Sequence, residues 1–216
     1  MEHEVVVRGQ GEVKAMPDRA TVRVMVDGTG SSRDEAYAEA ARAAAAVDEV
    51  LRGQTDALGS VMTAALIVQP RTRWQNGEAV RTGWAASRTS ILEVRALERL
   101  SDLLGHLAAS GAAISNRSWE LDAANEAHDQ VRSRAGEDAR RRAERYATSL
   151  GIKLGGIAWV AEPGLRIGGN HFSPDGVAFA AAPRAMAAGA GPPIEVAPEE
   201  ITLTASVEVG FAIATA

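Results

Sequence analysis

Residues 20–26, ATVRVMV, alternate between apolar and polar side chains, and residues 32–35, SRDE, follow shortly after them. Period-two alternation is typical of a strand with one buried face. A serine followed three residues later by glutamate forms a capping box, which starts a helix. An apolar stripe then predicts a helix that runs to about Arg52 and stops at Gly53. The stripe consists of Ala36, Ala40, Ala43, Val47, Val50 and Leu51.

The same criteria extend outward along the chain. They predict strands near 5–14, 60–74, 80–94, 114–121, 156–162 and 201–213, and helices near 97–109 and 125–150. The order β-β-α-β-β-α-β-α-β-β indicates an α+β fold, with an antiparallel sheet and helices on one of its faces. Its middle part matches a ferredoxin-like split βαββαβ unit. We treat residues 1–216 as a single domain. The last helix has small or apolar residues at every fourth position: Ala127, Val131, Ala135, Ala139, Ala143 and Ala147.

The sequence QNGE at residues 75–78 joins two strands that are longer than usual. An Asn-Gly pair suits a tight hairpin turn, so we expect a hairpin of about residues 60–94 that projects from the domain. A two-stranded hairpin is marginally stable alone, and large aromatic residues often anchor subunit contacts. We therefore predict an oligomer interface at Trp74, Asn76, Gly77 and Trp84. Packing of the tryptophans in the core is the alternative.

Residues 163–198 are rich in glycine, alanine and proline and show little periodicity. A stretch of this length without regular structure is usually disordered or functional, and we expect a mobile loop. Phe172 and Phe179 are weaker candidates for contacts made by this loop. The alternative is a passive linker.

The composition excludes several classes of site. The 216 residues carry a formal net charge of −5 and include no cysteine, so this sequence offers no disulfide, thiolate metal site or cysteine nucleophile. The histidines are scattered, without the local pairing typical of zinc ligands. We recognise no nucleophile elbow or catalytic triad. We therefore expect no enzymatic activity, no metal site and no cofactor.

Two G-x-G motifs and an arginine-rich helix raise the question of anion binding. Gly9-Gln10-Gly11 lacks a third glycine and a following helix, and Gly28-Thr29-Gly30 lacks the end of a phosphate-binding loop. The arginines of helix 125–150 have acidic neighbours that can pair with them. We therefore expect no nucleic-acid partner. A small-molecule or anion site in a cleft between sheet and helices remains the alternative function.

The sequence contains no apolar window of 18 residues, so we expect no membrane span. Its first residues lack the basic and apolar regions of a signal peptide. We therefore expect a cytoplasmic protein. The alternative is an exported protein whose signal peptide has been removed.

Several local sequences, in this order and spacing, resemble the SIMPL-domain family, long catalogued as a domain of unknown function. They are VRGQGEV at 7–13 with MPDRA at 16–20, LIVQP at 66–70 with GWAAS at 83–87, the alanine-rich residues 139–156, and residues 193–211.

The resemblance implies an α+β fold and a tendency to form large ring- or cage-like homo-oligomers. It also suggests roles in stress tolerance and in the cell envelope. It implies no reaction, because no catalytic residues are established for the family. We therefore predict a non-enzymatic protein whose partner is itself, in a closed assembly larger than a dimer.

Overall fold

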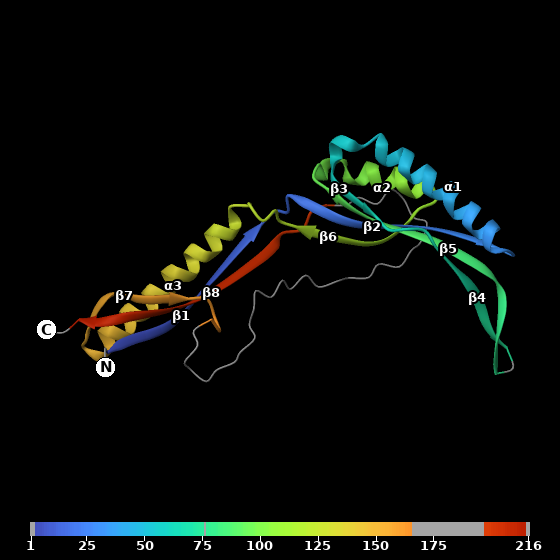
Figure 1. Cartoon of the computed structure of the whole chain (residues 1–216). Helices are drawn as coiled ribbons and strands as arrows, with labels where there is room; N and C mark the ends of the chain where they lie inside the picture. The colour runs from blue at the N-terminus through green and yellow to red at the C-terminus, as the bar shows by residue number, and fades with distance from the viewer. Residues whose placement is uncertain (1–2, 76, 166–196, 215–216) are drawn as a thin grey trace. The chain divides into compact units, whose positions relative to one another are not determined.

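The computed structural model describes residues 3–75, 77–165 and 197–214, which form two compact units. Unit 1 combines residues 3–16, 122–165 and 200–214, and unit 2 consists mainly of residues 17–121. Figure 1 shows the elements of both units. The expected α+β class with antiparallel strands is confirmed, although the strands divide between two sheets.

Unit 1 is a three-stranded antiparallel sheet with one helix on it. The strand order is β1-β8-β7, and helix α3 lies along β1 and β8 (Figure 1). Val7, Val209 and Phe211 pack beneath the alanines of the helix. The elements are β1 (Glu4–Ala15), α3 (Ala127–Leu150), β7 (Lys153–Ala161) and β8 (Ile201–Ala214).

Unit 2 is a larger antiparallel sheet with two helices on the same face. The strand order is β3-β5-β2-β6, and β4 pairs with β5 beyond the end of β3. Leucines of α2 and valines of β2 and α1 form the main core between helices and sheet. The elements are β2 (Arg19–Gly30), α1 (Arg33–Arg52), β3 (Leu58–Thr63), β4 (Ile67–Gln75), β5 (Glu78–Val94), α2 (Leu100–Ala109) and β6 (Ala113–Glu120).

Most elements agree with the sequence analysis. The capping box at Ser32 is present, and every member of the stripe on α3 is buried. The prediction of one strand over residues 60–74 is wrong, because the chain breaks into β3 and β4. Between Thr63 and Ile67 it advances four residues while β5 advances three, from Ser90 to Ser87. The extra residue is accommodated as a bulge, and Leu66 packs against α1 there.

Two finer expectations stay predictions: the ferredoxin-like unit, and the treatment of residues 1–216 as one domain. The extent of the projecting hairpin, about residues 60–94, also stays a prediction; at its turn, Gln75 pairs with Glu78. The expected mobile loop at 163–198, with Phe172 and Phe179, lies almost entirely outside the described residues.

The first G-x-G motif is a packing surface for α3. A Cβ atom on Gly9 would come within 2.1 Å of the carbonyl oxygen of Ala135, and one on Gly11 within 2.2 Å of that of Val131. Glycine lets two backbones approach closely, and the alanines of α3 present only a methyl group to the strand. Helix and strand are therefore in direct backbone contact.

The second G-x-G motif repeats this arrangement in unit 2. A Cβ atom on Gly28 would lie 2.3 Å from the nitrogen of Ala40, and one on Gly30 would lie 2.6 Å from the nitrogen of Ala36. Both alanines belong to the buried stripe of α1. Neither motif needs a phosphate ligand to explain its glycines.

Carboxylates on both helices also bond the strand backbone at these motifs. Asp138 Oδ2 accepts the backbone N–H of Gln10 at 3.0 Å, and Glu39 Oε2 accepts that of Thr29 at 2.5 Å. Arg134 donates to the carbonyl oxygen of Glu12 at 2.6 Å. β1 is an edge strand, and β2 has no described strand beside it on the side of β6 beyond Met25. These side chains therefore satisfy backbone groups that would otherwise be exposed.

We predict that Gly9→Ala lowers the free energy of unfolding by about 1–3 kcal/mol, because the methyl group would push α3 from the strand. The matched control is Gly136→Ala, an exposed position on the same helix with open space around its Cβ. That change removes a helix-interior glycine and should stabilise by up to about 1 kcal/mol. Urea denaturation of both variants measures the effect, and equal changes would contradict the packing role.

We also predict a pH-dependent contribution from Asp138. The bond from the Gln10 N–H, with help from Arg141 and Arg142, lowers its pKa below the ordinary value of 3.8. Because the pKa is lower in the folded protein, the ionised carboxylate stabilises the fold at pH values above the ordinary pKa. This contribution is lost as the pH falls through the folded-state pKa. Asp138→Asn should therefore cost stability near neutral pH and little near pH 2. A difference from wild type that stays constant from neutral to acid pH in denaturation experiments would contradict this role.

Candidate interaction surface

The hairpin of β4 and β5 continues past the rest of its sheet. The last pairing of β2 joins Gly30 to Trp84, so earlier residues of β5 pair only with β4. We call this two-stranded part the ribbon; it consists of residues 71–75 and 78–83 and projects from unit 2 in Figure 1. All its side chains are exposed, glycine apart. Gly77 forms the turn at a φ of 85°, and Asn76 lies outside the described residues.

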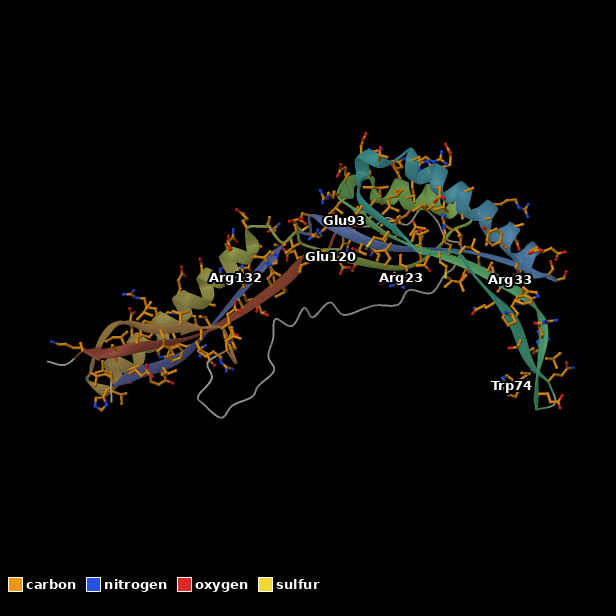
Figure 2. The ribbon with its side chains drawn as sticks, viewed as in Figure 1. Arg23, Arg33, Trp74, Glu93, Glu120 and Arg132 are labelled. Atoms are coloured by element: carbon orange, nitrogen blue, oxygen red, sulfur yellow. The ribbon has the colours of Figure 1, made fainter. Side chains whose placement is uncertain are left out.

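The two tryptophans of the predicted interface lie in different surroundings. Trp74 lies near the tip of the ribbon with 76% of its surface exposed (Figure 2). Trp84, at the base, packs against a cluster of Ala36, Ala40 and Ala86 on α1 and β5. The guanidinium of Arg81 lies over its ring at 5.6 Å. Packing in the core therefore applies in part to Trp84. It does not apply to Trp74, which no described residue covers.

The ribbon combines exposed apolar and basic side chains. Val80 is 43% exposed on β5, and Ile67, just below the ribbon on β4, is 61% exposed. The ribbon carries one acid, Glu78, and three basic residues, Arg71, Arg73 and Arg81. Isolated exposed apolar residues are ordinary, but a group of them on a thin projecting element is typical of an interaction surface. The role of Trp74, Asn76, Gly77 and Trp84 in an interface stays a prediction.

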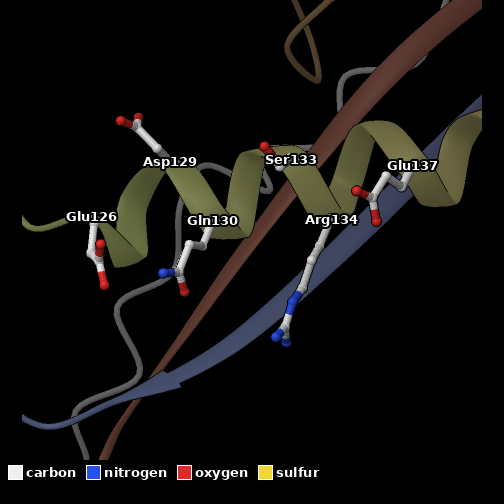
Figure 3. A pocket seen from close by; sticks show the side chains of 6 residues that line it. All are labelled: Glu126, Asp129, Gln130, Ser133, Arg134 and Glu137. Carbon is white, nitrogen blue, oxygen red and sulfur yellow. The ribbon is translucent and has the colours of Figure 1, made fainter.

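A shallow hollow of about 420 Å³ lies along α3 in unit 1 (Figure 3). The basic residue of its lining, Arg134, extends toward β1, where its guanidinium donates a hydrogen bond to the backbone carbonyl oxygen of Glu12. Three carboxylates in the lining make it unfavourable for an anion. The small-molecule alternative stays a prediction. The lining residues are Glu126, Asp129, Gln130, Ser133, Arg134 and Glu137.

The other chemical candidates have structural partners. On α3, Arg140 pairs with Glu144, and Arg141 and Arg142 both pair with Asp138. These pairs match the surface-helix interpretation of the arginine run. Across the described ranges, no group of three or more histidine or acidic side chains is arranged to hold a metal ion.

Sequence reasoning missed a third tryptophan with a defined role. Trp159 of β7 lies over Gly210 of β8, where a Cβ atom would meet its Nε1 at 2.1 Å. The same Nε1 donates to Glu4 Oε2 at 2.7 Å. The signal was the glycine in the alternating strand 201–213, since an interior glycine marks a close approach.

Within the part of the chain that the structure describes, no helix combines the length and apolar character needed to cross a membrane. The compartment stays a prediction.

The fold and surface define an α+β protein with antiparallel sheets, alanine-rich helices and a projecting ribbon. The chain belongs to the SIMPL family, described as a protein of unknown function (DUF541), whose sequence profile matches residues 5–211. It is 28% identical over 154 residues to the uncharacterized protein YggE of Escherichia coli strain K12, and equally to YggE of Shigella flexneri. The match covers 71% of this chain and 63% of those relatives.

We predict that Gly77→Val disorders the ribbon, because a β-branched residue at positive φ costs about 1–2 kcal/mol or more. Gly77→Asn is the matched control, since asparagine tolerates this conformation. Amide hydrogen exchange of Trp74 and Ala79, which pair across the ribbon, should accelerate in the valine variant alone. Equal protection in both variants would contradict the turn requirement.

Proposed function

We propose that this protein is a non-enzymatic, self-assembling member of its family that forms a closed ring- or cage-like homo-oligomer. The ribbon provides a contact between subunits. The role is architectural and requires no catalytic residue or cofactor. The family resemblance supports roles in stress tolerance or the cell envelope for such an assembly.

The exposure of Trp74 carries this proposal. Its indole lies on a two-stranded ribbon that no described helix of its unit covers, with 76% of its surface exposed. A ribbon this thin gains little stability from its own contacts, whereas burying a tryptophan at an interface is among the strongest single contributions to association. A second subunit would cover both the indole and the ribbon edges.

The edges of the ribbon support the same conclusion. The outer side of β4 and the side of β5 before Trp84 have no strand beside them among the described residues. Exposed strand edges present unpaired N–H and C=O groups that pair readily with another chain. On β1, by contrast, Asp138 and Arg134 occupy such groups. The edges of the ribbon are therefore better suited to pairing between subunits than the edge of β1.

We predict that the wild-type chain has a solution mass that is a discrete multiple of 22.6 kDa, larger than a dimer and stable on dilution. Trp74→Ala should lower that mass, because losing a buried tryptophan weakens an interface by about 2 kcal/mol or more. Size exclusion with light scattering at two protein concentrations measures both.

The control for that experiment is Tyr37→Ala, which removes an aromatic residue that is 53% exposed on α1 of the same unit. It should leave the mass unchanged. Trp84 is a poorer probe, because its packing on α1 makes any change affect the fold. A wild-type monomer, or an unchanged mass for Trp74→Ala, would contradict the proposal for the ribbon.

A further inference from the structure

The sheet of unit 2 has one face that no described helix covers. Val22, Val24 and Val26 point toward α1 and α2 and are buried. Because side chains alternate along a strand, Arg23, Met25 and Asp27 of β2 lie on the opposite face. Arg23 and Asp27 are exposed there, and Arg23 is labelled in Figure 2.

The strand register shows which residues of the neighbouring strands lie beside Arg23, Met25 and Asp27 on the same face. On β5, Ile91 lies opposite Arg23, Thr89 opposite Met25, and Ser87 opposite Asp27. One strand further out, Met62 of β3 pairs with Ile91, and Ile67 of β4 pairs with Ser87. Directly paired residues share a face. The uncovered face therefore has a charge and an apolar residue at each end, with Met25 and Thr89 between them.

Two charged side chains on this face, those of Arg23 and Asp27, have no partner among the described residues of their own subunit. Their backbones belong to the β-sheet, but neither side chain forms a hydrogen bond or ion pair with any other described residue. They cannot pair with each other, because four residues of strand separate them by about 13 Å. Nearby on the same face, Glu93 is paired with Arg95 at 2.8 Å. Arg23 and Asp27 are therefore available to a partner.

The apolar residues are also uncovered. Met62 is 62% exposed and Ile67 is 61% exposed, although both lie on strands of the sheet. An antiparallel sheet with one face in water normally shows polar side chains there. Exposed apolar residues such as Met62 and Ile67, which both lie beside β5, are more typical of a face that packs on another sheet.

We propose that two copies of this chain pack these faces together about a two-fold axis that runs across the strands at Met25 and Thr89. This inference deepens the self-assembly proposed above and rests on it. The axis reverses the strand direction of the second copy. Arg23 of one copy then lies against Asp27 of the other, and Met62 lies against Ile67, each pair occurring twice. The partner is a second copy because, about this axis, the face places opposite charges together and apolar residues together.

The flanking rows are compatible with this packing. Thr21 would face Thr29 of the second copy, and Glu93 would face Ala85, since these residues occupy equivalent positions on either side of the axis. No two like charges meet in these rows. Packed sheets keep their strands within about 30° of each other. The arginine and aspartate side chains can span the small displacement that this angle produces between facing residues. Such an isologous contact, combined with the ribbon contact, provides the two kinds of interface from which a closed cage can form.

Charge reversal tests the contact without disturbing the fold, because neither charged side chain has a partner among the described residues. We expect Arg23→Glu alone and Asp27→Arg alone to weaken the pairing roughly 100-fold, since each places like charges together twice. Mixing the two variants should restore it, because every contact then joins opposite charges. Arg33→Glu, on the opposite side of the unit at the start of α1, is the control and should have no effect.

The experiment is done in the full chain, with and without Trp74→Ala. With the ribbon contact removed, we expect a species of twice 22.6 kDa that either charge variant reduces to a monomer and the mixture restores. A monomer for Trp74→Ala alone would overturn the two-fold contact and leave the ribbon proposal intact. An unchanged mass for Trp74→Ala would overturn the ribbon contact instead, and the charge variants would then have to lower the native mass. Charge variants that behave as the control would overturn the present inference in either background.

Discussion

The close approach of an alanine-faced helix to a glycine-containing strand is the contact on which both units depend. In unit 1, α3 rests on Gly9 and Gly11, and in unit 2, α1 rests on Gly28 and Gly30. A methyl group on any of these glycines would lie within 3 Å of the helix backbone. Packing of this kind removes water between backbones without large side chains. It explains how a chain with 4% aromatic residues builds two ordered units.

The same approach positions polar groups on the helices beside the strand backbone. Asp138 and Glu39 each accept an N–H from the residue between the two glycines of a motif. In each case the acid immediately precedes an alanine that touches the motif, Ala139 or Ala40. The two units thus use one local arrangement, built from segments far apart in the sequence. It protects strand edges where a helix lies close to them.

Two surfaces of unit 2 receive no such protection from the described helices. The ribbon extends beyond the start of α1, and the sheet face opposite the helices carries Arg23, Met25 and Asp27. The first surface offers an exposed indole and strand edges, and the second offers charges and apolar residues arranged symmetrically about Met25. An assembly that uses both would be held by contacts of different chemistry, one mainly aromatic and one partly electrostatic. The family has no assigned function. Assembly through these two surfaces is therefore the property that experiments can test most directly.

The sequence by itself determined the helices, the alternating strands, the capping box and the Asn-Gly turn, because these depend on residues close together in the chain. It also suggested Trp74 and Trp84 as interface candidates, but could not tell which of them packs within its own unit. Only the tertiary structure showed that Trp84 packs on α1 while Trp74 does not. It also showed that alanines of a helix pack against each G-x-G motif, and for Gly9 these alanines are more than a hundred residues away in the sequence. The pairing of β1 with β8, the break between β3 and β4, and the alignment of Arg23 with Ile91 and Met62 likewise depend on strand register. Register is set by contacts between distant segments, which local patterns do not encode.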